Sequence, residues 1–451
     1  MMRERLIRFG LAAAVALVAV QLGAGIVQHG GLIALVVPAT LAVLLLITLV
    51  AAVAPGHGGP MAFDRILRWT IGAFGAHLAF GLLVTNTSEL ARYLGGDQAT
   101  YHELAKAIAS HWTEGSQMPH LAAGKEGYYY ILAGLYWVFG PYTSSGLVLN
   151  AALSAALVPV VSDTARRLLG DRAARLVPPL VVLLPGMFLW TSQLLKEAPI
   201  VFLVAVAANV GTRLAERVTM GRLCAFSLAT AVLLTVRGYI GLALAVSILA
   251  ALVVGRGSVA RGLVPAAAAA AMLAILVLTV GLGRRGYEST VATDLERVNV
   301  IRLEQARTGA SGFGGDVDIS TPQRALSFLP VGVIQFTFGP FPWQITSFRQ
   351  LPALPDAIVW WALIPSLVRG VRVGLRDAGR RVLILVVPAI AATLPLALLI
   401  GNFGTVARER TQVMVLLVPL IAAGMAARKP SEEALASQPG GHSRQCDGAG
   451  I

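Results

Sequence analysis

The chain has 451 residues, of which 56% are apolar and only 13% are charged, and its mean hydropathy is +0.73. A soluble domain surrounds itself with a surface in which about 25 to 35% of the side chains are charged, and this composition cannot supply one. The sequence therefore excludes a soluble enzyme and indicates an integral membrane protein. The net charge of +13 requires no nucleic-acid partner if the basic residues gather in the loops on one side of the membrane.

Apolar stretches along the chain predict an all-α polytopic membrane protein with twelve transmembrane helices. A helix needs about 20 apolar residues to cross the hydrocarbon core. The first stretch follows a short basic N-terminus, but no small-residue cleavage site comes after it, so we predict a helix rather than a signal peptide. The predicted spans are Leu6–Val27, Leu32–Ala54, Ile66–Asn86, Thr143–Ala165, Ala174–Trp190, Glu197–Thr212, Leu223–Val236, Gly238–Val254, Val264–Leu282, Asp356–Leu375, Val382–Ile400 and Thr411–Ala427.

The distribution of charge predicts the orientation of these helices. With both termini in the cytoplasm, 22 of the 36 basic residues but only 9 of the 23 acidic residues fall in the inner segments. Such a bias is the one that orients helices in a plasma (inner) membrane. The tail, residues 428–451, is rich in Ser, Gly and Pro and is predicted to be a disordered cytoplasmic segment.

Three long polar stretches fall on the extracytoplasmic side, at residues 87–142, 283–325 and 341–355. Long loops on a rigid scaffold commonly carry function, so we expect the active site there. In the first stretch Asp97 follows two glycines and precedes a predicted interfacial helix. The carboxylate is either a helix N-cap or a reactive group, and its position alone leaves both open. Apolar residues of that helix recur at helical spacing, at Tyr101, Leu104, Ala105, Ile108 and Trp112.

An aromatic segment, GYYYILAGLYWVFGP, follows that helix, and the next spanning helix ends in ARRLLG. Together with the preceding Asp97 loop, this order resembles the GT-C superfamily of polytopic glycosyltransferases. That group includes protein mannosyltransferases that use dolichyl-phosphate-mannose and bacterial aminoarabinose and arabinofuranosyl transferases. The resemblance covers residues 66–215, and it implies that Asp97 is the catalytic base or orients the acceptor. The family often has a second acidic residue next, where this chain has Gln98, and residues 1–65 add two helices before the core.

Four sites on the outer side place charges in or beside predicted spans. They are distributed over the core, residues 66–215, and the further transmembrane helices, residues 216–427. Each such charge costs about 2.5 to 3.5 kcal/mol, so it needs a partner or a ligand. Arginine forms two parallel hydrogen bonds with phosphate oxygens, and the resemblance implies that a basic residue near a late helix holds the lipid phosphate. The alternatives are ordinary ion pairs and interfacial anchors. The candidate phosphate contacts are Arg408, Arg410, Lys196 and Arg237.

Further polar and aromatic residues on the same side are candidates for contacts with the acceptor or the sugar. Trp343 lies in a Pro- and aromatic-rich segment, residues 328–347, which predicts an interfacial or re-entrant element, and an aromatic-belt role is its alternative. Histidines of the Asp97 loop show no spacing typical of a metal site, so a divalent metal stays open. The candidate acceptor and sugar contacts are Glu197, Tyr101, His102, Trp343 and Gln344.

These features predict a glycosyltransferase that moves a sugar from a polyprenyl-phosphate donor to a glycan, lipid or protein acceptor. One carboxylate to take a proton and a basic cluster to stabilise the leaving phosphate are sufficient for this chemistry, and no nucleotide-binding loop is required. A polymerase or ligase of lipid-linked glycans is an alternative with the same architecture. A lipid-sugar flippase or transporter is a third, but it predicts charges at mid-span, whereas here they gather at one face.

Overall fold

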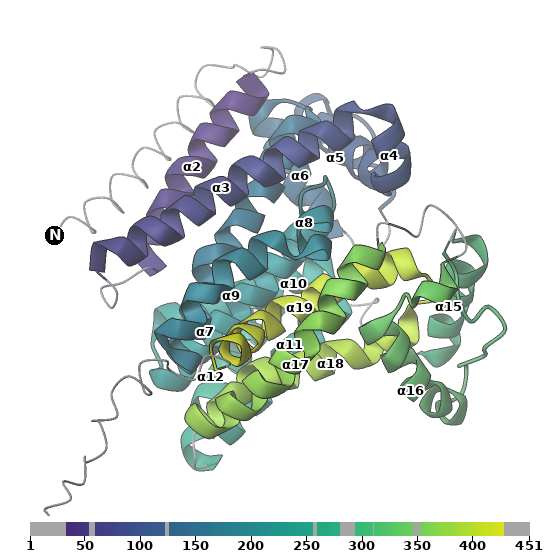
Figure 1. Cartoon of the computed structure of the whole chain (residues 1–451). Coiled ribbons are helices and arrows are strands. Elements are labelled where there is room, and N and C mark those ends of the chain that lie inside the picture. The colour runs from purple at the N-terminus through teal and green to yellow at the C-terminus, as the bar shows by residue number, and fades with distance from the viewer. Residues whose placement is uncertain are drawn as a thin grey trace, which may run out of the picture.

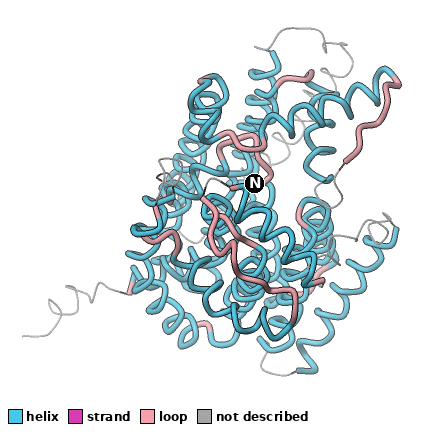
Figure 2. The backbone as a smooth tube through the Cα atoms, turned by 90° about the vertical axis from the view of Figure 1, so that its right-hand side faces the viewer, coloured by secondary structure: helices cyan, strands magenta, loops and turns pink. Residues whose placement is uncertain are grey.

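The computed structural model describes residues 33–53, 59–121, 126–255, 259–279, 294–309, 311–345, 351 and 353–427. Within these ranges there are 16 α-helices and two short 3-10 turns, and the pairing of Gly312 with Asn402 is an isolated β-bridge. Figure 2 shows helices joined by loops throughout. The predicted all-α fold class is confirmed for the described part of the chain.

The helices differ widely in length, and their bounds are as follows. They are α2 (Ile33–Val53), α3 (Gly59–Asn86), α4 (Ser88–Leu94), α5 (Gln98–Glu114), α6 (Glu126–Phe139), α7 (Thr143–Leu183), α8 (Pro185–Thr191), α9 (Glu197–Glu216), α10 (Met220–Val236), α11 (Gly238–Gly255), α12 (Val259–Thr279), α15 (Leu295–Thr308), α16 (Pro322–Phe338), α17 (Ala353–Asp377), α18 (Leu383–Leu399) and α19 (Phe403–Ala426). The 3-10 turns are η2 (Pro342–Gln344) and η4 (Gly379–Val382).

The chain is a multi-pass membrane protein by the length and composition of its helices. Among the described residues, seven helical stretches are long and apolar enough to cross a membrane, and three apolar stretches, in α10, α11 and α12, are shorter. A helix such as α10, with 17 residues, spans only about 25 Å, short of the roughly 30 Å hydrocarbon core. The predicted number of twelve is therefore not confirmed. The first predicted span, Leu6–Val27, and the tail of residues 428–451 lie outside the described residues.

The two spans predicted at Thr143–Ala165 and Ala174–Trp190 form a hairpin rather than one straight rod. Gly170 breaks α7 with non-helical dihedral angles (φ 85°, ψ 176°), a conformation that favours glycine because it has no Cβ. Beyond this break the chain returns along the first arm, since the Ser154 hydroxyl donates to the Thr191 carbonyl 3.1 Å away. The residues after α8 are thereby brought back to the end of the bundle where α7 starts.

Helices α7 and α19 form the buried centre of the bundle (Figure 1). Helix α19 packs against α7, α9, α17 and α18. Its approach to α17 depends on glycine, because a Cβ on Gly370 would lie 1.7 Å from the Leu420 carbonyl oxygen, and one on Gly424 would lie 1.8 Å from that of Ser366. Small residues let two membrane helices pack backbone against backbone, so this pair is held rigidly.

Helix α19 begins at Phe403, eight residues before the predicted start at Thr411. The reason is an N-cap that the prediction overlooked. The side-chain oxygen of Asn402 accepts hydrogen bonds from the backbone N–H groups of Gly404 (2.8 Å) and Thr405 (3.4 Å). The sequence ARER is therefore inside the helix, and its side chains point to different faces.

Candidate functional site

Asp97 lies at the turn between α4 and α5, at one end of the bundle. Gly96 adopts a positive φ of 46° there, which lets the chain turn into α5. Asp97 occupies the N-cap position, but its carboxylate accepts no capping hydrogen bond. The alternative that the Asp97 carboxylate serves as the N-cap of α5 is therefore wrong. Its carboxylate is 57% exposed, and its Oδ2 lies 3.3 Å from Nη1 of Arg408 on α19, 311 residues further along the chain.

Arg408 connects Asp97 to a chain of buried charges contributed by α9, by α19 and by the junction of α10 and α11. Its Nε lies 3.1 Å from Oε1 of Glu197, in the first turn of α9. Arg237, the single residue between α10 and α11, lies 3.9 Å from the same carboxylate oxygen and 2.6 Å from Oε1 of Glu409. The order of contacts is thus Asp97, Arg408, Glu197, Arg237, Glu409, and we call these five residues the Asp97 cluster.

Burial increases along the Asp97 cluster, from the exposed Asp97 through the partly buried Arg408 to the almost fully buried Glu197, Arg237 and Glu409. Much of its hydrogen-bonding capacity is unused. Neither carboxylate oxygen of Glu197 accepts a well-aligned hydrogen bond from the described residues. The Nε–H groups of Arg237 and Arg408 donate none to them. Buried polar groups are almost always hydrogen-bonded, so the Asp97 cluster is suited to receive polar groups of a ligand.

The short irregular segment between α8 and α9, residues 192–196, positions Glu197 and the buried Lys196. The buried side chain of Asn150 on α7 donates to the carbonyls of Gln193 (2.5 Å) and Leu195 (2.8 Å). From the other side, Gln98 at the start of α5 accepts from the Leu194 N–H at 3.1 Å. Gln98, which stands where the GT-C family often has an acidic residue, therefore fastens the Asp97 turn to the segment that carries Lys196 and Glu197.

Replacing Asn150 with Leu is expected to destabilise the protein by about 2 kcal/mol or more, because two buried carbonyls lose their donor. Hydrogen–deuterium exchange should rise in residues 191–196, and the melting temperature should fall. The matched control is Ser144→Ala on the same helix, since the buried Ser144 hydroxyl oxygen has no hydrogen-bond partner in the described part of the chain. An Asn150→Leu protein with unchanged exchange in this segment would contradict the assignment.

Arg410 lies apart from the Asp97 cluster, on the opposite face of α19. Its guanidinium donates to the carbonyls of Thr337 (3.2 Å) and Gly339 at the end of α16, and the residue is 1% exposed. The reason is helix geometry, because residues two apart are rotated by about 200° and do not share a face. Arg410 thus ties α19 to α16, whereas Arg408 faces Asp97.

Tyr101 and His102 lie on α5, one turn after Asp97, but in different surroundings. Tyr101 is buried against the rings of Tyr128 and Tyr129. Burial, followed by the nearby negative charge of Glu197, raises the pKa of its phenol, so Tyr101 stays protonated at neutral pH and can donate a hydrogen bond. Burial lowers the pKa of His102, whose Nδ1 lies 2.9 Å from the Tyr136 hydroxyl. The charges of the Asp97 cluster therefore act on the Tyr101 phenol, whereas His102 contacts Tyr136.

Trp343 and Gln344 belong to η2, after α16, on the Arg410 side of α19. Trp343 is 77% exposed and stacks on Phe341 with a ring-centroid distance of 4.8 Å. Gln344 accepts from the Phe341 N–H at 3.0 Å, and its amide lies 3.3 Å from the side-chain oxygen of Gln335. The contacts of both residues are thus local. The first part of residues 328–347, which were predicted to form an interfacial or re-entrant element, is regular helix as far as Phe338.

Two residues of the site were not predicted. Glu409 stands between the two arginines that were singled out, and Tyr239, whose hydroxyl donates to Glu409 Oε2 at 3.3 Å, follows Arg237 by two residues. A signal for Glu409 was present, because a carboxylate within an apolar helix needs a cation nearby. Asn150 gave a similar signal as a lone amide in an apolar span. Among the described residues, no group of three or more His, Cys, Asp or Glu side chains could hold a metal ion.

Comparison with known proteins gives a likeness of fold. No protein-family model matches the sequence, and no curated protein matches it significantly. The structure is similar to ArnT from Cupriavidus metallidurans bound to undecaprenyl phosphate, with a TM-score of 0.50, 17% identity, and coverage of 82% of this chain and 61% of that one. The apo form of ArnT aligns with a TM-score of 0.39 over 74% of this chain and 56% of that chain, at the same identity.

The chain thus spans about three fifths of the length of the ArnT chain that it matches (61%). At 17% identity the likeness concerns the fold alone. At that level the likeness expected from the sequence is confirmed for the fold, which this chain shares with ArnT.

Proposed function

We propose that this protein is a membrane glycosyltransferase that moves a sugar from a polyprenyl-phosphate donor to an acceptor on the extracytoplasmic side. The observation that carries the proposal is the convergence of Asp97, from the turn before α5, and Glu197, from the first turn of α9, on the guanidinium of Arg408. The GT-C fold and the undecaprenyl phosphate bound to ArnT support the choice of donor. The excess of basic residues in the other set of loops supports an extracytoplasmic position for the Asp97 end.

In this proposal Asp97 accepts the proton of the acceptor hydroxyl, whose oxygen attacks the anomeric carbon of the donor sugar. The bond from that carbon to the phosphate oxygen breaks, and the lipid phosphate leaves with the electron pair. Arg408 stabilises the growing negative charge, because a guanidinium can form two parallel hydrogen bonds with phosphate oxygens. Its ion pair with Asp97 opens as the phosphate replaces the carboxylate.

The other buried groups are assigned supporting roles. Lys196, beside Glu197, is the second cation proposed for the phosphate. Glu197 and Tyr101 are proposed to bind hydroxyl groups of the sugar or the acceptor. Arg237 already lies between two carboxylates, so we assign it to positioning Glu197 and α19. Arg410, His102, Trp343 and Gln344 receive no ligand contact in this proposal, because each is bound to neighbouring protein groups.

Replacing Arg408 with Gln is expected to weaken undecaprenyl phosphate binding by about 10- to 100-fold, since hydrogen bonds to a charged group contribute about 1.5 to 3 kcal/mol. Binding can be measured by native mass spectrometry of the purified chain in detergent. The control is Arg324→Gln on α16, an exposed arginine paired with Asp318. Equal binding by the wild type and Arg408→Gln would contradict the proposal.

A transfer assay separates the proposal from its alternative. The wild type should transfer one sugar from a polyprenyl-phosphate monosaccharide to an acceptor present in the cell envelope. Transfer of a block from a diphosphate-linked oligosaccharide would instead identify a polymerase or ligase.

A further inference from the structure

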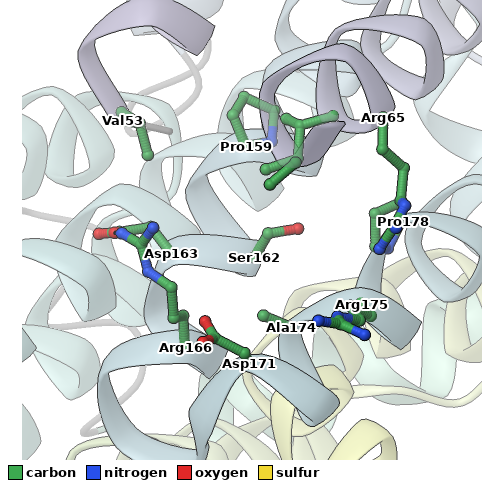
Figure 3. Close-up of a pocket in the computed structure, with 12 residues that line it drawn as sticks. Val53, Arg65, Pro159, Ser162, Asp163, Arg166, Asp171, Ala174, Arg175 and Pro178 are labelled. Atoms are coloured by element: carbon green, nitrogen blue, oxygen red, sulfur yellow. Dashed lines mark hydrogen bonds and ion pairs between the residues drawn. The ribbon is translucent and has the colours of Figure 1, made fainter. Parts of the chain in front are cut away.

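A polar cavity lies at the opposite end of the bundle from Asp97. It has a volume of about 270 Å³ and is formed by α2, α3 and both arms of α7 (Figure 3). The length of α9 gives the distance between the cavity and the Asp97 cluster. Glu197 is in the first turn of α9, and Arg213, which contacts Asp163 in the cavity wall, is in its last turn. Sixteen residues of helix extend about 24 Å. The cavity is therefore separate from the Asp97 cluster.

The acidic group in the inner wall of this cavity, Asp163, is already paired with arginines. Asp163 is buried, and its carboxylate lies 2.5 Å from Arg166, 2.7 Å from Arg167 and 2.8 Å from Arg213. The hairpin at Gly170 brings the second arm of α7, which carries Arg175, against the first arm. Arg167 also pairs with Glu216 at 2.8 Å, so three cations and two carboxylates leave a small net positive charge at this wall.

Three arginines from different segments line the cavity: Arg65 of α3 and, on the two arms of α7, Arg166 and Arg175. Neither Arg65 nor Arg175 forms an ion pair with any described residue, although the exposed Asp171 also lies in the lining. The hydroxyl of Ser162, which is 3% exposed, has no hydrogen-bond partner in the described part of the chain, and Figure 3 shows it pointing into the cavity. These groups are suited to an anion with several acceptor oxygens.

A largely apolar groove continues from the cavity along α3 and the second arm of α7. This second hollow, of about 510 Å³, shares Arg65 with the cavity and is lined further on by Arg68, Trp69, Gly72, Ala73 and Val182. A Cβ built on Gly72 meets no atom within 4 Å, so the groove is open there. Both walls belong to helices that are long and apolar enough to cross a membrane. A hydrocarbon chain fits this position.

We propose that the cavity binds the headgroup of an anionic membrane phospholipid, with one acyl chain in the groove beside Trp69 and Gly72. The phosphate lies between Arg65, Arg166 and Arg175 and accepts a hydrogen bond from Ser162. The continuous apolar groove favours a lipid over a soluble anion, and basic pockets between membrane helices are typical sites for anionic lipid headgroups. The bound lipid ties α2 and α3 to the hairpin of α7.

The test uses the full-length chain purified in detergent, with phosphatidylglycerol, phosphatidylcholine or inorganic phosphate added. Native mass spectrometry and thermal unfolding should show retention of phosphatidylglycerol and stabilisation by it, with little effect of the other two. The Arg65→Gln/Arg175→Gln double variant should weaken phosphatidylglycerol binding by about tenfold or more, because the charge-assisted contacts are lost. Gly72→Leu, which fills the groove, should also reduce retention of the lipid.

Arg372→Gln/Arg376→Gln is the matched control, because it removes two arginines near the same end of the bundle but outside the cavity. Both arginines are on α17 close to Gly374, which contacts Leu169 next to the Gly170 break in α7, and this contact places them at the same end of the bundle as the cavity. Phosphatidylglycerol binding equal in the control, the cavity variant and Gly72→Leu would overturn the proposal. Stabilisation by inorganic phosphate alone, lost in the cavity variant, would overturn the lipid assignment. Should the arginine variant fail to fold, Gly72→Leu and the lipid series on the wild type still decide.

Discussion

Asp97→Asn is expected to lower the rate of sugar transfer by about 10²- to 10⁴-fold, the range in which a general base contributes. The amide has nearly the same shape as the carboxylate but cannot accept the acceptor's proton. Because the Asp97 side chain is 57% exposed and makes no capping hydrogen bond, helix α5 does not depend on it, and the variant should fold. The measurement is transfer from a polyprenyl-phosphate sugar by the reconstituted protein.

Donor binding provides the internal check on Asp97→Asn. Removing the charge that pairs with Arg408 leaves the guanidinium available, so undecaprenyl phosphate should bind at least as tightly as to the wild type. Glu103→Gln on the same helix, with its side chain 69% exposed, is the matched control and should retain activity. If Asp97→Asn turned over at the wild-type rate, Asp97 would not be the base.

Arg237→Met is expected to give the largest loss of stability, about 3 to 5 kcal/mol, because removing one partner leaves buried charges without compensation. Arg237 is the cation between Glu197 and Glu409, and all three side chains are at most 6% exposed. The free energy of unfolding, or the melting temperature in detergent, measures the effect. A matched Arg324→Met variant removes an exposed arginine and should change stability little.

A double variant tests whether the loss comes from the buried charge itself. Arg237→Met/Glu409→Gln should be more stable than Arg237→Met alone, because the second change removes one of the carboxylates left without a partner. An additive loss, with the double variant less stable than either single variant, would assign the effect of Arg237 to packing instead.

The residues of the site were largely recognisable in the sequence because charges in an apolar chain are conspicuous. Lys196, Glu197, Arg237 and Arg408 stand at or near the ends of predicted spans, and Asp97 stands in a long outer loop. The structure brings all five to the same end of the bundle. Arg410 was grouped with Arg408 because the start of α19 was predicted too late. With the helix starting at Phe403, the two side chains point in opposite directions.

Contacts between distant segments had no comparable signal. Asn150 is conspicuous as a lone amide in an apolar span, but it binds the backbone carbonyls of Gln193 and Leu195, which are groups that every residue carries, so the sequence does not indicate its partners. Likewise, the cavity between Arg65 and Arg175 exists because Gly170 reverses the chain between two stretches that composition predicts separately.

Composition and periodicity alone predict that this chain is helical, that it lies in a membrane and which side its basic loops prefer, because these properties depend on the solvent around each segment. Which charge meets which is a property of the packed bundle. The pairing of Asp97 with Arg408 across 311 residues, and the diversion of Arg410 to the end of α16, depend on helix phase and on how closely α19 approaches its neighbours. A shift of one residue in the start of a helix rotates every later side chain by about 100°. The sequence therefore identifies candidate residues, and the packing of the helices determines which groups each of them contacts.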